Sequence, residues 1–310
     1  MQYQQWLKEW LESYVKPSAK QKTYIRYSEI VEQHIIPKLG SYNMEELTPI
    51  ILQHFTTELL QSGNLKTGGG LSANSVNAII SVIQNSLKVA RAMEIVSEYS
   101  ADKIKRPKVR EKQVTCFTPN EQKQIEQAIL NGKKPKMFGI ILCLYTGLRI
   151  GELLALEWKD MDFQKGTLSV TKTCHDGKDS NGNFARITDT PKTDTSHRII
   201  PFPKQLIPYL RNLKKNSKSE YVVANESNRV ISIRAYQRSF ELFLKRLSIP
   251  HKGFHSLRHT FATRALECGM DVKTLSEILG HKNANVTLNR YVHSLMEHKR
   301  EMMNRLGKLL

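Results

Sequence analysis

Two histidines and an arginine are crowded into HSLRHTFAT, residues 255–263, where a helix is predicted to begin. Residues three apart on a helix share a face, so His255 and Arg258 are expected to lie together. A guanidinium offers a planar fork of donors that matches two phosphate oxygens, and the amides of a helix N-terminus favour the same ligand. The stretch therefore indicates either a phosphate site or a capping histidine beside a surface arginine.

Two further stretches add cations suited to the same ligand. Arg149 lies in the apolar stretch YTGLRIGELLAL, where a charge is costly without a partner, and Glu152 is placed to pair with it. The pair either orients Arg149 or is purely structural. Lys192 lies in TPKTDTSHR between two strand-like runs. It is either an ammonium that a hairpin turn holds over a ligand groove or an ordinary turn lysine. Lys172 and Lys178 lie in the same predicted hairpin region.

A histidine and a tyrosine near the C-terminus complete the set. His281 follows a glycine that is predicted to end a helix. Tyr291, in LNRYVHS, is either a reactive phenol or an aromatic side chain of the core. Two arginines, a lysine and two histidines around one phosphodiester would neutralise the charge that develops on its oxygens, each donor contributing about 10²–10³ in rate. A phenol with a pKa of roughly 10 is both a nucleophile and a fair leaving group. This chemistry needs no cofactor, and the sequence offers no clear metal site.

The composition indicates a polyanionic partner. The 310 residues include 47 Lys and Arg against 29 Asp and Glu, a formal net charge of +18. Nucleic acid is the usual partner of such a surplus, and a basic protein without one is the alternative. The four scattered cysteines form no CxxC pair, which argues against a disulfide framework or a zinc site. No apolar run approaches the roughly 18–20 residues that span a bilayer, so no membrane association is expected.

The elements that would position these groups fall into two domains and a linker. Residues 1–101 are predicted to be helical, with a long helix at 73–96 capped by Ser72. Residues 102–114 form a basic linker that either contacts phosphates or stays solvated. Residues 115–310 begin with a helix capped by Thr118 or Asn120. An apolar helix, a glycine-containing break and a short helix follow at 136–156, then strand-like runs at 166–174 and 185–202 around a loop at 175–183. The expected fold class is mainly α with a small antiparallel β-sheet, ending in a helical tail.

The ordered set of residues resembles the tyrosine recombinase, or phage integrase, family, and most resembles integrases of phages and conjugative transposons. The family's motif is an arginine in T-G-L-R-x-x-E, a hairpin lysine, H-x-x-R, a G-H pair and a tyrosine nine or ten residues later. Six residues match it in order: Arg149, Lys192, His255, Arg258, His281 and Tyr291. The resemblance covers nearly the whole chain. It implies that 1–101 is a helical, SAM-like core-binding domain and that 115–310 is an α+β catalytic domain.

The resemblance also implies which groups would hold the phosphate. Arg149 and Arg258 would clamp the scissile phosphate, His281 would hydrogen-bond to it, and Glu152 would support Arg149. The linker residues expected to contact DNA are Lys103, Lys105, Arg106, Lys108 and Arg110.

The remaining residues would handle the nucleophile and the protons. Tyr291 would be the nucleophile, His255 would accept its proton, and Lys192 would protonate the leaving 5′-oxygen. The implied activity is site-specific recombination of duplex DNA through a 3′-phosphotyrosyl intermediate, without a metal, which integrates or excises a mobile element. The alternatives are Xer-like resolution of chromosome or plasmid dimers, a type IB topoisomerase, and a DNA-binding regulator that no longer cuts.

The implied partners are duplex core sites and accessory DNA-bending or directionality factors. The chain would be a monomer when free and would join three further copies of itself in a synaptic tetramer. A bacterial or phage-encoded protein of this kind is expected in the cytoplasm with the nucleoid. In relatives a helix after the tyrosine often docks on a neighbouring protomer; the alternative is a helix that packs on its own domain. Many integrases carry an extra N-terminal domain that binds arm sites, whereas the core-binding helices predicted here begin almost at Met1. Either the protein is naturally of the two-domain kind, or the sequence has been trimmed.

Overall fold

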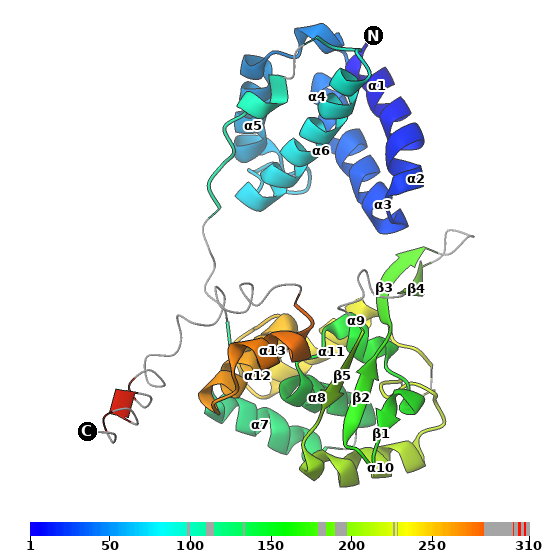
Figure 1. Ribbon diagram of the computed structural model, residues 1–310, viewed down its shortest axis with the longest axis vertical. Helices are drawn as coiled ribbons and strands as arrows, with labels where there is room; N and C mark the ends of the chain where they lie inside the picture. The colour runs from blue at the N-terminus through cyan, green and yellow to red at the C-terminus, as the bar shows by residue number, and fades with distance from the viewer. Residues whose placement is uncertain are drawn as a thin grey trace. The chain divides into compact units, whose positions relative to one another are not determined.

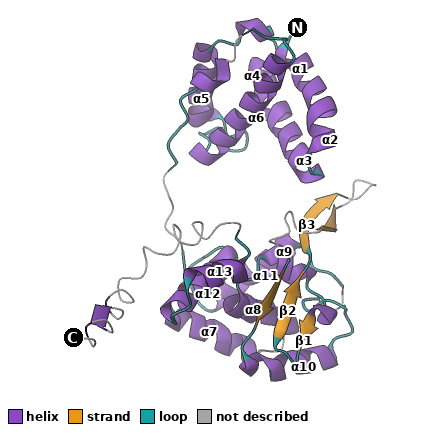
Figure 2. Cartoon of the chain, in the orientation of Figure 1, coloured by secondary structure: helices purple, strands orange, loops and turns teal. Residues whose placement is uncertain are grey.

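Figure 1 shows a computed structural model, which describes residues 1–97, 100–109, 115–132, 134–178, 184–189, 197–225, 227, 229–281, 300, 303, 304 and 307. The chain divides into two units, Met1–Lys112 and Gln113–Leu310. Helices predominate in both, and the described strands all belong to the second unit (Figure 2). The predicted class, mainly α with a small antiparallel sheet, is confirmed, but the described strands form two sheets and not one.

The first unit is a bundle of helical segments. They are α1 (Tyr3–Trp10), the π turn η1 (Leu11–Val15), α2 (Lys16–Ser18), α3 (Gln21–Ile30), the π turn η2 (Val31–Ile35), α4 (Ile36–Leu39), the 3-10 turns η3 (Met44–Glu46) and η4 (Ser100–Lys103), α5 (Pro49–Ser62) and α6 (Ala73–Ala92). Pro17 and Pro37 each lie just after a π turn. A proline ring collides with the carbonyl four residues earlier in an α-helix. The wider π turns relieve this collision, so both helices continue past their prolines.

The long helix α6 organises the core of this unit. Ser72 caps it as predicted, its hydroxyl accepting from the amide of Ser75 at 3.2 Å. The hydroxyls of Tyr3 and Ser86 are hydrogen-bonded at 2.8 Å, and the indole of Trp6 donates to the Ser86 carbonyl, which ties α1 to α6. The helix ends at Ala92, before the predicted 96, because the chain turns out of helical geometry through a left-handed residue at 94.

The first part of the predicted linker 102–114 packs on the first unit. Ile104 is buried in the core of that unit. The Lys105 amide donates to Oε1 of Gln53 at 2.9 Å, and the Asn77 side-chain amide donates to the Pro107 carbonyl at 3.1 Å. Residues 110–114, including Arg110, lie outside the described residues. Residues 100–109 therefore pack on the helical bundle, an arrangement that neither predicted alternative for the linker, contact with phosphates or full solvation, included.

The second unit is built around the buried helix α8. Its helices are α7 (Pro119–Leu130), η5 (Pro135–Met137), α8 (Phe138–Thr146), α9 (Ile150–Ala155), η6 (Trp158–Asp160), η8 (Lys204–Leu206), α10 (Ile207–Asn216), α11 (Ile233–Arg246), α12 (His255–Glu267) and α13 (Val272–Leu279). Of the two predicted caps of α7, Thr118 is the one that bonds: its hydroxyl accepts from the Glu121 amide at 3.2 Å, and the Glu121 carboxylate accepts from the Thr118 amide.

Two small antiparallel sheets lie beside these helices. β1 (Met161–Asp162), β2 (Thr167–Val170) and β5 (Arg198–Pro201) form one, in the order β1-β2-β5, and β3 (Thr173–Lys178) pairs with β4 (Phe184–Asp189) in the other. The prediction of a loop at 175–183 was wrong for 175–178, which belong to β3. Cross-strand pairing with β4 overrides the turn-forming residues there. The run 185–202 supplies β4 and β5 to different sheets, and residues 190–196 lie outside the described residues.

Replacing Gly147 with alanine is expected to destabilise the second unit more than the same change at Gly269. Both glycines have a positive φ, 65° and 88°, which strains an L residue by about 1 kcal/mol or more. A Cβ at Gly147 would also lie 2.5 Å from Phe261 Cδ1 and 2.8 Å from Leu279 Cδ2, whereas no described atom lies within 4 Å at Gly269. Urea unfolding measures both losses. Equal losses would show that the packing of α8 against α12 accommodates a methyl group.

Candidate functional site

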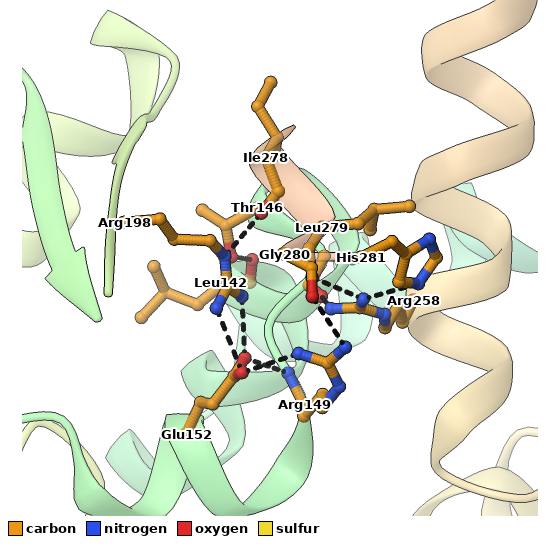
Figure 3. A network of polar contacts seen from close by, with 11 residues as sticks. Leu142, Thr146, Arg149, Glu152, Arg198, Arg258, Ile278, Leu279, Gly280 and His281 are labelled. Atoms are coloured by element: carbon orange, nitrogen blue, oxygen red, sulfur yellow. Dashed lines mark hydrogen bonds and ion pairs between the residues drawn. The ribbon is translucent and has the colours of Figure 1, made fainter. Parts of the chain in front are cut away.

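Arg258, near the start of α12, is buried although it carries a full charge. Only 2% of its surface is exposed. Nη1 donates to the Gly147 carbonyl at 2.7 Å, Nη2 donates to the Leu279 carbonyl at 2.6 Å, and Nη2 lies 3.0 Å from Nε2 of His281 (Figure 3). The guanidinium therefore spans the C-terminal ends of α8 and α13, and the alternative of a surface arginine is wrong.

The two helix ends explain how this buried cation is tolerated. The last carbonyls of a helix lack donors within the helix and carry the negative end of its dipole. Left-handed glycines end both helices: Gly147 ends α8 and Gly280 ends α13. Arg258 satisfies carbonyls at both ends, so two dipoles stabilise its charge and its planar fork is held in one orientation.

Arg149 lies at the start of α9, and its side chain is 39% exposed. Its Nη1 donates to Oε1 of Glu152 at 2.8 Å, and its backbone amide donates to Oε2 of the same carboxylate at 2.9 Å. Nη2 lies 3.3 Å from the Gly280 carbonyl oxygen, to which it donates. The predicted pairing of Arg149 with Glu152 is confirmed, and it leaves the guanidinium partly open to solvent.

Arg198, which sequence reasoning missed, is the second partner of Glu152. Its Nη1 and Nη2 donate to Oε1 and Oε2 at 3.0 and 2.8 Å, and both side chains are 6% exposed. Burial opposes ionisation of Glu152, but the hydrogen bonds and charges of Arg198, and then of Arg149, outweigh it and lower the pKa of the carboxyl to about 2. A signal for Arg198 existed: an arginine opening the apolar strand RIIP needs a partner, by the argument applied to Arg149.

Three consecutive carbonyls at the end of α13 hold the three arginines together (Figure 3). The Ile278 carbonyl accepts from Nε of Arg198 at 2.6 Å, the next carbonyl accepts from Arg258, and the Gly280 carbonyl accepts from Arg149. These side chains come from β5, α12 and α9, which are far apart in the sequence. The end of α13 is therefore the point at which the site is assembled.

The histidines occupy two different positions. His281 follows directly on Gly280; its amide donates to the Ser276 carbonyl at 3.0 Å and its ring lies against Arg258. His255 is exposed, and its ring meets that of His259 edge-on, with centroids 4.6 Å apart. The sequence predicts that His255 and Arg258 lie together on one face, but His255 is exposed to solvent and Arg258 is buried. The Ser256 and Leu257 amides donate to backbone carbonyls, so the start of α12 offers fewer amides to an anion than predicted.

The structure brings together only part of the predicted set. Arg149, Glu152, Arg258 and His281 converge at the end of α13. Lys192 and Tyr291 lie outside the described residues. Lys172, one of the alternative hairpin lysines, is 2.6 Å from Oε1 of Glu157 and forms an ion pair with it.

The predicted linker cations lie on the first unit. Four of them are described, and the side chain of each is exposed: Lys103, Lys105, Arg106 and Lys108. The Arg106 guanidinium bonds to its own unit, through the Asn77 carbonyl at 3.3 Å and the Ser81 hydroxyl at 3.1 Å. This fixes the direction of the Arg106 side chain while part of it remains in solvent.

Neither a metal centre nor a membrane span is found in the described parts of the chain. The described residues contain no group of three or more His, Cys, Asp or Glu side chains placed to hold a metal ion. None of the described helices is both long and apolar enough to cross a membrane.

Glu152 is expected to make the stability of the second unit depend on pH between about 4.5 and 2. Its pKa is lower in the folded state than its ordinary 4.5, so its contribution is complete above pH 4.5 and is lost as the pH falls toward 2. The contribution is on the order of 3 kcal/mol. Urea unfolding at several pH values should show a shallower acid slope for Glu152→Gln than for wild type. The exposed Glu277→Gln is the control, and equal slopes for all three would contradict the charge state assigned to Glu152.

Comparison with known proteins agrees with this architecture. Residues 115–298 match the model of the phage integrase family, and residues 2–60 match that of the phage integrase N-terminal SAM-like domain. A "Tyrosine recombinase XerC-like" protein of Caldanaerobacter subterraneus subsp. tengcongensis is 29% identical over 97% of this chain and 81% of its own length. The ICEBs1 integrase of Bacillus subtilis is 26% identical over 94% of this chain and 79% of its own length.

Among solved structures, the Tn1549 transposon integrase in complex with a circular intermediate DNA superposes with a TM-score of 0.81. It is 22% identical and covers 99% of both chains, so it supports the fold. The SAM-like N-terminal match, the phage integrase match and the XerC-like relative together make this protein a tyrosine site-specific recombinase. The chain belongs to the phage integrase family.

Proposed function

We propose that this recombinase is an integrase that cuts and rejoins duplex DNA through a 3′-phosphotyrosyl intermediate and so integrates or excises a mobile element. The observation that carries the proposal is the convergence of Arg149, Arg258 and His281 at the C-terminal end of α13. Preorganised donors of this kind stabilise a phosphorane-like transition state because they need no reorganisation when charge develops on its oxygens.

In the proposed reaction Tyr291 Oη attacks the scissile phosphorus. The Oη–P bond forms as the P–O5′ bond breaks, His255 takes the phenolic proton, and Lys192 protonates the leaving 5′-oxygen. Arg149 and Arg258 bind the non-bridging oxygens. Because one phosphodiester replaces another, a DNA hydroxyl can reverse the step and join a new strand without an external energy source.

His281 and Glu152 have supporting roles. His281 hydrogen-bonds to the same phosphate, and its ring is held in place by Arg258 at 3.0 Å. Glu152 orients Arg149 from the buried side, through two hydrogen bonds of 2.8 and 2.9 Å. Neither group needs to touch the reacting bond for the arginines to act.

The proposed partners are two duplex core sites and three further copies of the chain. Recombining two duplexes requires four strand cuts, and each protomer supplies one tyrosine, so a tetramer is the smallest complete assembly. The exposed cations of residues 103–108, on the first unit, would neutralise backbone phosphates. Such a reaction takes place where the chromosome lies, in the cytoplasm, and accessory DNA-bending or directionality factors would set its direction.

A Xer-like resolvase is the second candidate, and the XerC-like relative supports it by matching almost the whole chain. The proposed site is the same for both uses. They are distinguished by the DNA substrate: an integrase acts on the ends of an element and an attachment site, whereas a resolvase acts on two copies of one chromosomal or plasmid site.

A nicked duplex that traps the cut strand tests the proposal. The core sequence is taken from the ends of the element or gene neighbourhood that encodes the chain, and the reaction contains EDTA. We expect a denaturation-resistant protein–DNA band on this substrate and none on a scrambled duplex. Binding without a band on every candidate site would favour a regulator that does not cut. A band that requires Mg²⁺ would indicate a different phosphoryl-transfer mechanism.

A further inference from the structure

Arg198 is buried beside the proposed phosphate site without being one of the six motif residues. It stands at the start of β5, opposite Val170 of β2. Its side chain is 6% exposed and makes three described hydrogen bonds, two to the Glu152 carboxylate and one to the Ile278 carbonyl. In Figure 3 the guanidinium of Arg198 lies above the Glu152 carboxylate, and that of Arg149 lies to the right of the same carboxylate.

Glu152 is shared unequally between its two arginines. Arg198 binds it through both Nη atoms, in the bidentate fork that gives the strongest pairing with a carboxylate. Arg149 reaches it with one side-chain nitrogen, at 2.8 Å, and with its backbone amide. The carboxylate charge is therefore balanced mainly by Arg198, the more deeply buried of the two cations.

This sharing matters because a phosphate must compete with Glu152 for Arg149. If Arg149 were the sole partner of the buried Glu152 carboxylate, that carboxylate would cancel the charge of the Arg149 guanidinium. A carboxylate oxygen left without a donor would also attract this guanidinium away from solvent. With Arg198 present, two cations flank one anion, so the trio Arg149–Glu152–Arg198 has one net positive charge. That charge resides on the exposed member of the trio.

We propose that Arg198 is a positioning residue which, by occupying Glu152, keeps the positive charge of Arg149 available to the scissile phosphate. The inference rests on the proposed role of Arg149 in DNA cleavage. Arg198 does not itself contact the phosphate; it acts through Glu152 and Arg149. Cleavage should therefore depend on the net charge of the trio.

A structural explanation competes with this one. Arg198 also ties β5 to α13, since its Nε donates to Ile278 and its Cδ, Cζ and Nη1 lie 3.1–3.2 Å from where a Cβ on Gly280 would be. If that tie were its whole role, every variant lacking the guanidinium fork would be equally impaired, whatever its charge.

Three variants separate the two explanations. Arg198→Met removes the fork and the charge, Arg198→Lys removes the fork but keeps a charge, and Arg198→Met combined with Glu152→Gln restores the net charge of the trio without the fork. We expect Arg198→Met to slow single-turnover cleavage of the nicked duplex by about 100-fold, the scale of one preorganised donor. Arg198→Lys and the double variant should each cleave about tenfold faster than Arg198→Met.

The control measurements keep the outcome interpretable. The rates are taken at saturating protein so that they report cleavage and not DNA affinity, and circular dichroism shows that each variant is folded. If Arg198→Met does not fold, Arg198→Gln with and without Glu152→Gln gives the same comparison. Equal rates for the Lys, Met and double variants, or a double variant slower than Arg198→Met, would overturn the proposal. Adduct formation by wild type on the same duplex tests the proposed function separately.

Discussion

Replacing Tyr291 with phenylalanine is expected to abolish covalent attachment to DNA and to leave duplex binding unchanged. The substitution removes only the phenolic oxygen, the atom that would form the bond to phosphorus, and keeps the ring. No other group in the proposed reaction can take over a nucleophile's role without moving into line with the leaving oxygen. The measurement is the denaturation-resistant band on the nicked duplex, together with a binding titration on the intact duplex.

Tyr209 provides the matched control for this substitution. It lies exposed on α10, and Tyr209→Phe should form the adduct at the wild-type rate. An adduct that persists in Tyr291→Phe would displace Tyr291 as the nucleophile. Loss of DNA binding in Tyr291→Phe would instead mean that its hydroxyl has a structural role.

The second large effect is expected for Arg258→Lys, which should slow cleavage by about 10²–10³-fold. Arg258 reaches the Gly147 and Leu279 carbonyls with two different nitrogens, and its plane is fixed by them. A lysine ammonium is a point charge and cannot span both helix ends in one orientation. The variant keeps the positive charge, so the loss measures geometry and not net charge.

The exposed Arg211 of α10 is the control for this change, and Arg211→Lys should behave as wild type. Thermal unfolding of both variants identifies a temperature at which each is folded, and cleavage is compared there. A folded Arg258→Lys variant that cleaves within a fewfold of wild type would contradict the assignment of Arg258 to the phosphate.

The helices and the pairing of Arg149 with Glu152 could be predicted because their signals are local. The break between α8 and α9 follows from a glycine that must adopt a positive φ, and the caps Ser72 and Thr118 are read from residue type and spacing. Arg149 and Glu152 are three residues apart on one helix start, so their pairing follows from helical geometry.

The features that the sequence did not predict depend on contacts between distant segments. Arg198 meets Glu152 only because β5 pairs with β2 and the end of α13 lies against β5. Asp176 is a turn-forming residue, yet it lies in β3 and its carboxylate accepts from the Ile233 and Arg234 amides at the start of α11. Tertiary contacts of this kind override local preference and leave no periodic trace in the sequence.

The most direct test of the proposed mechanism is to identify the residue that becomes linked to DNA. The adduct formed on the nicked duplex in EDTA is digested with trypsin and nuclease, and the nucleotide-bearing peptide is sequenced by mass spectrometry. We expect the modification on Tyr291, the only tyrosine of the tryptic peptide 291–299. A nucleotide attached to any other residue would contradict the mechanism, even if cleavage itself were efficient.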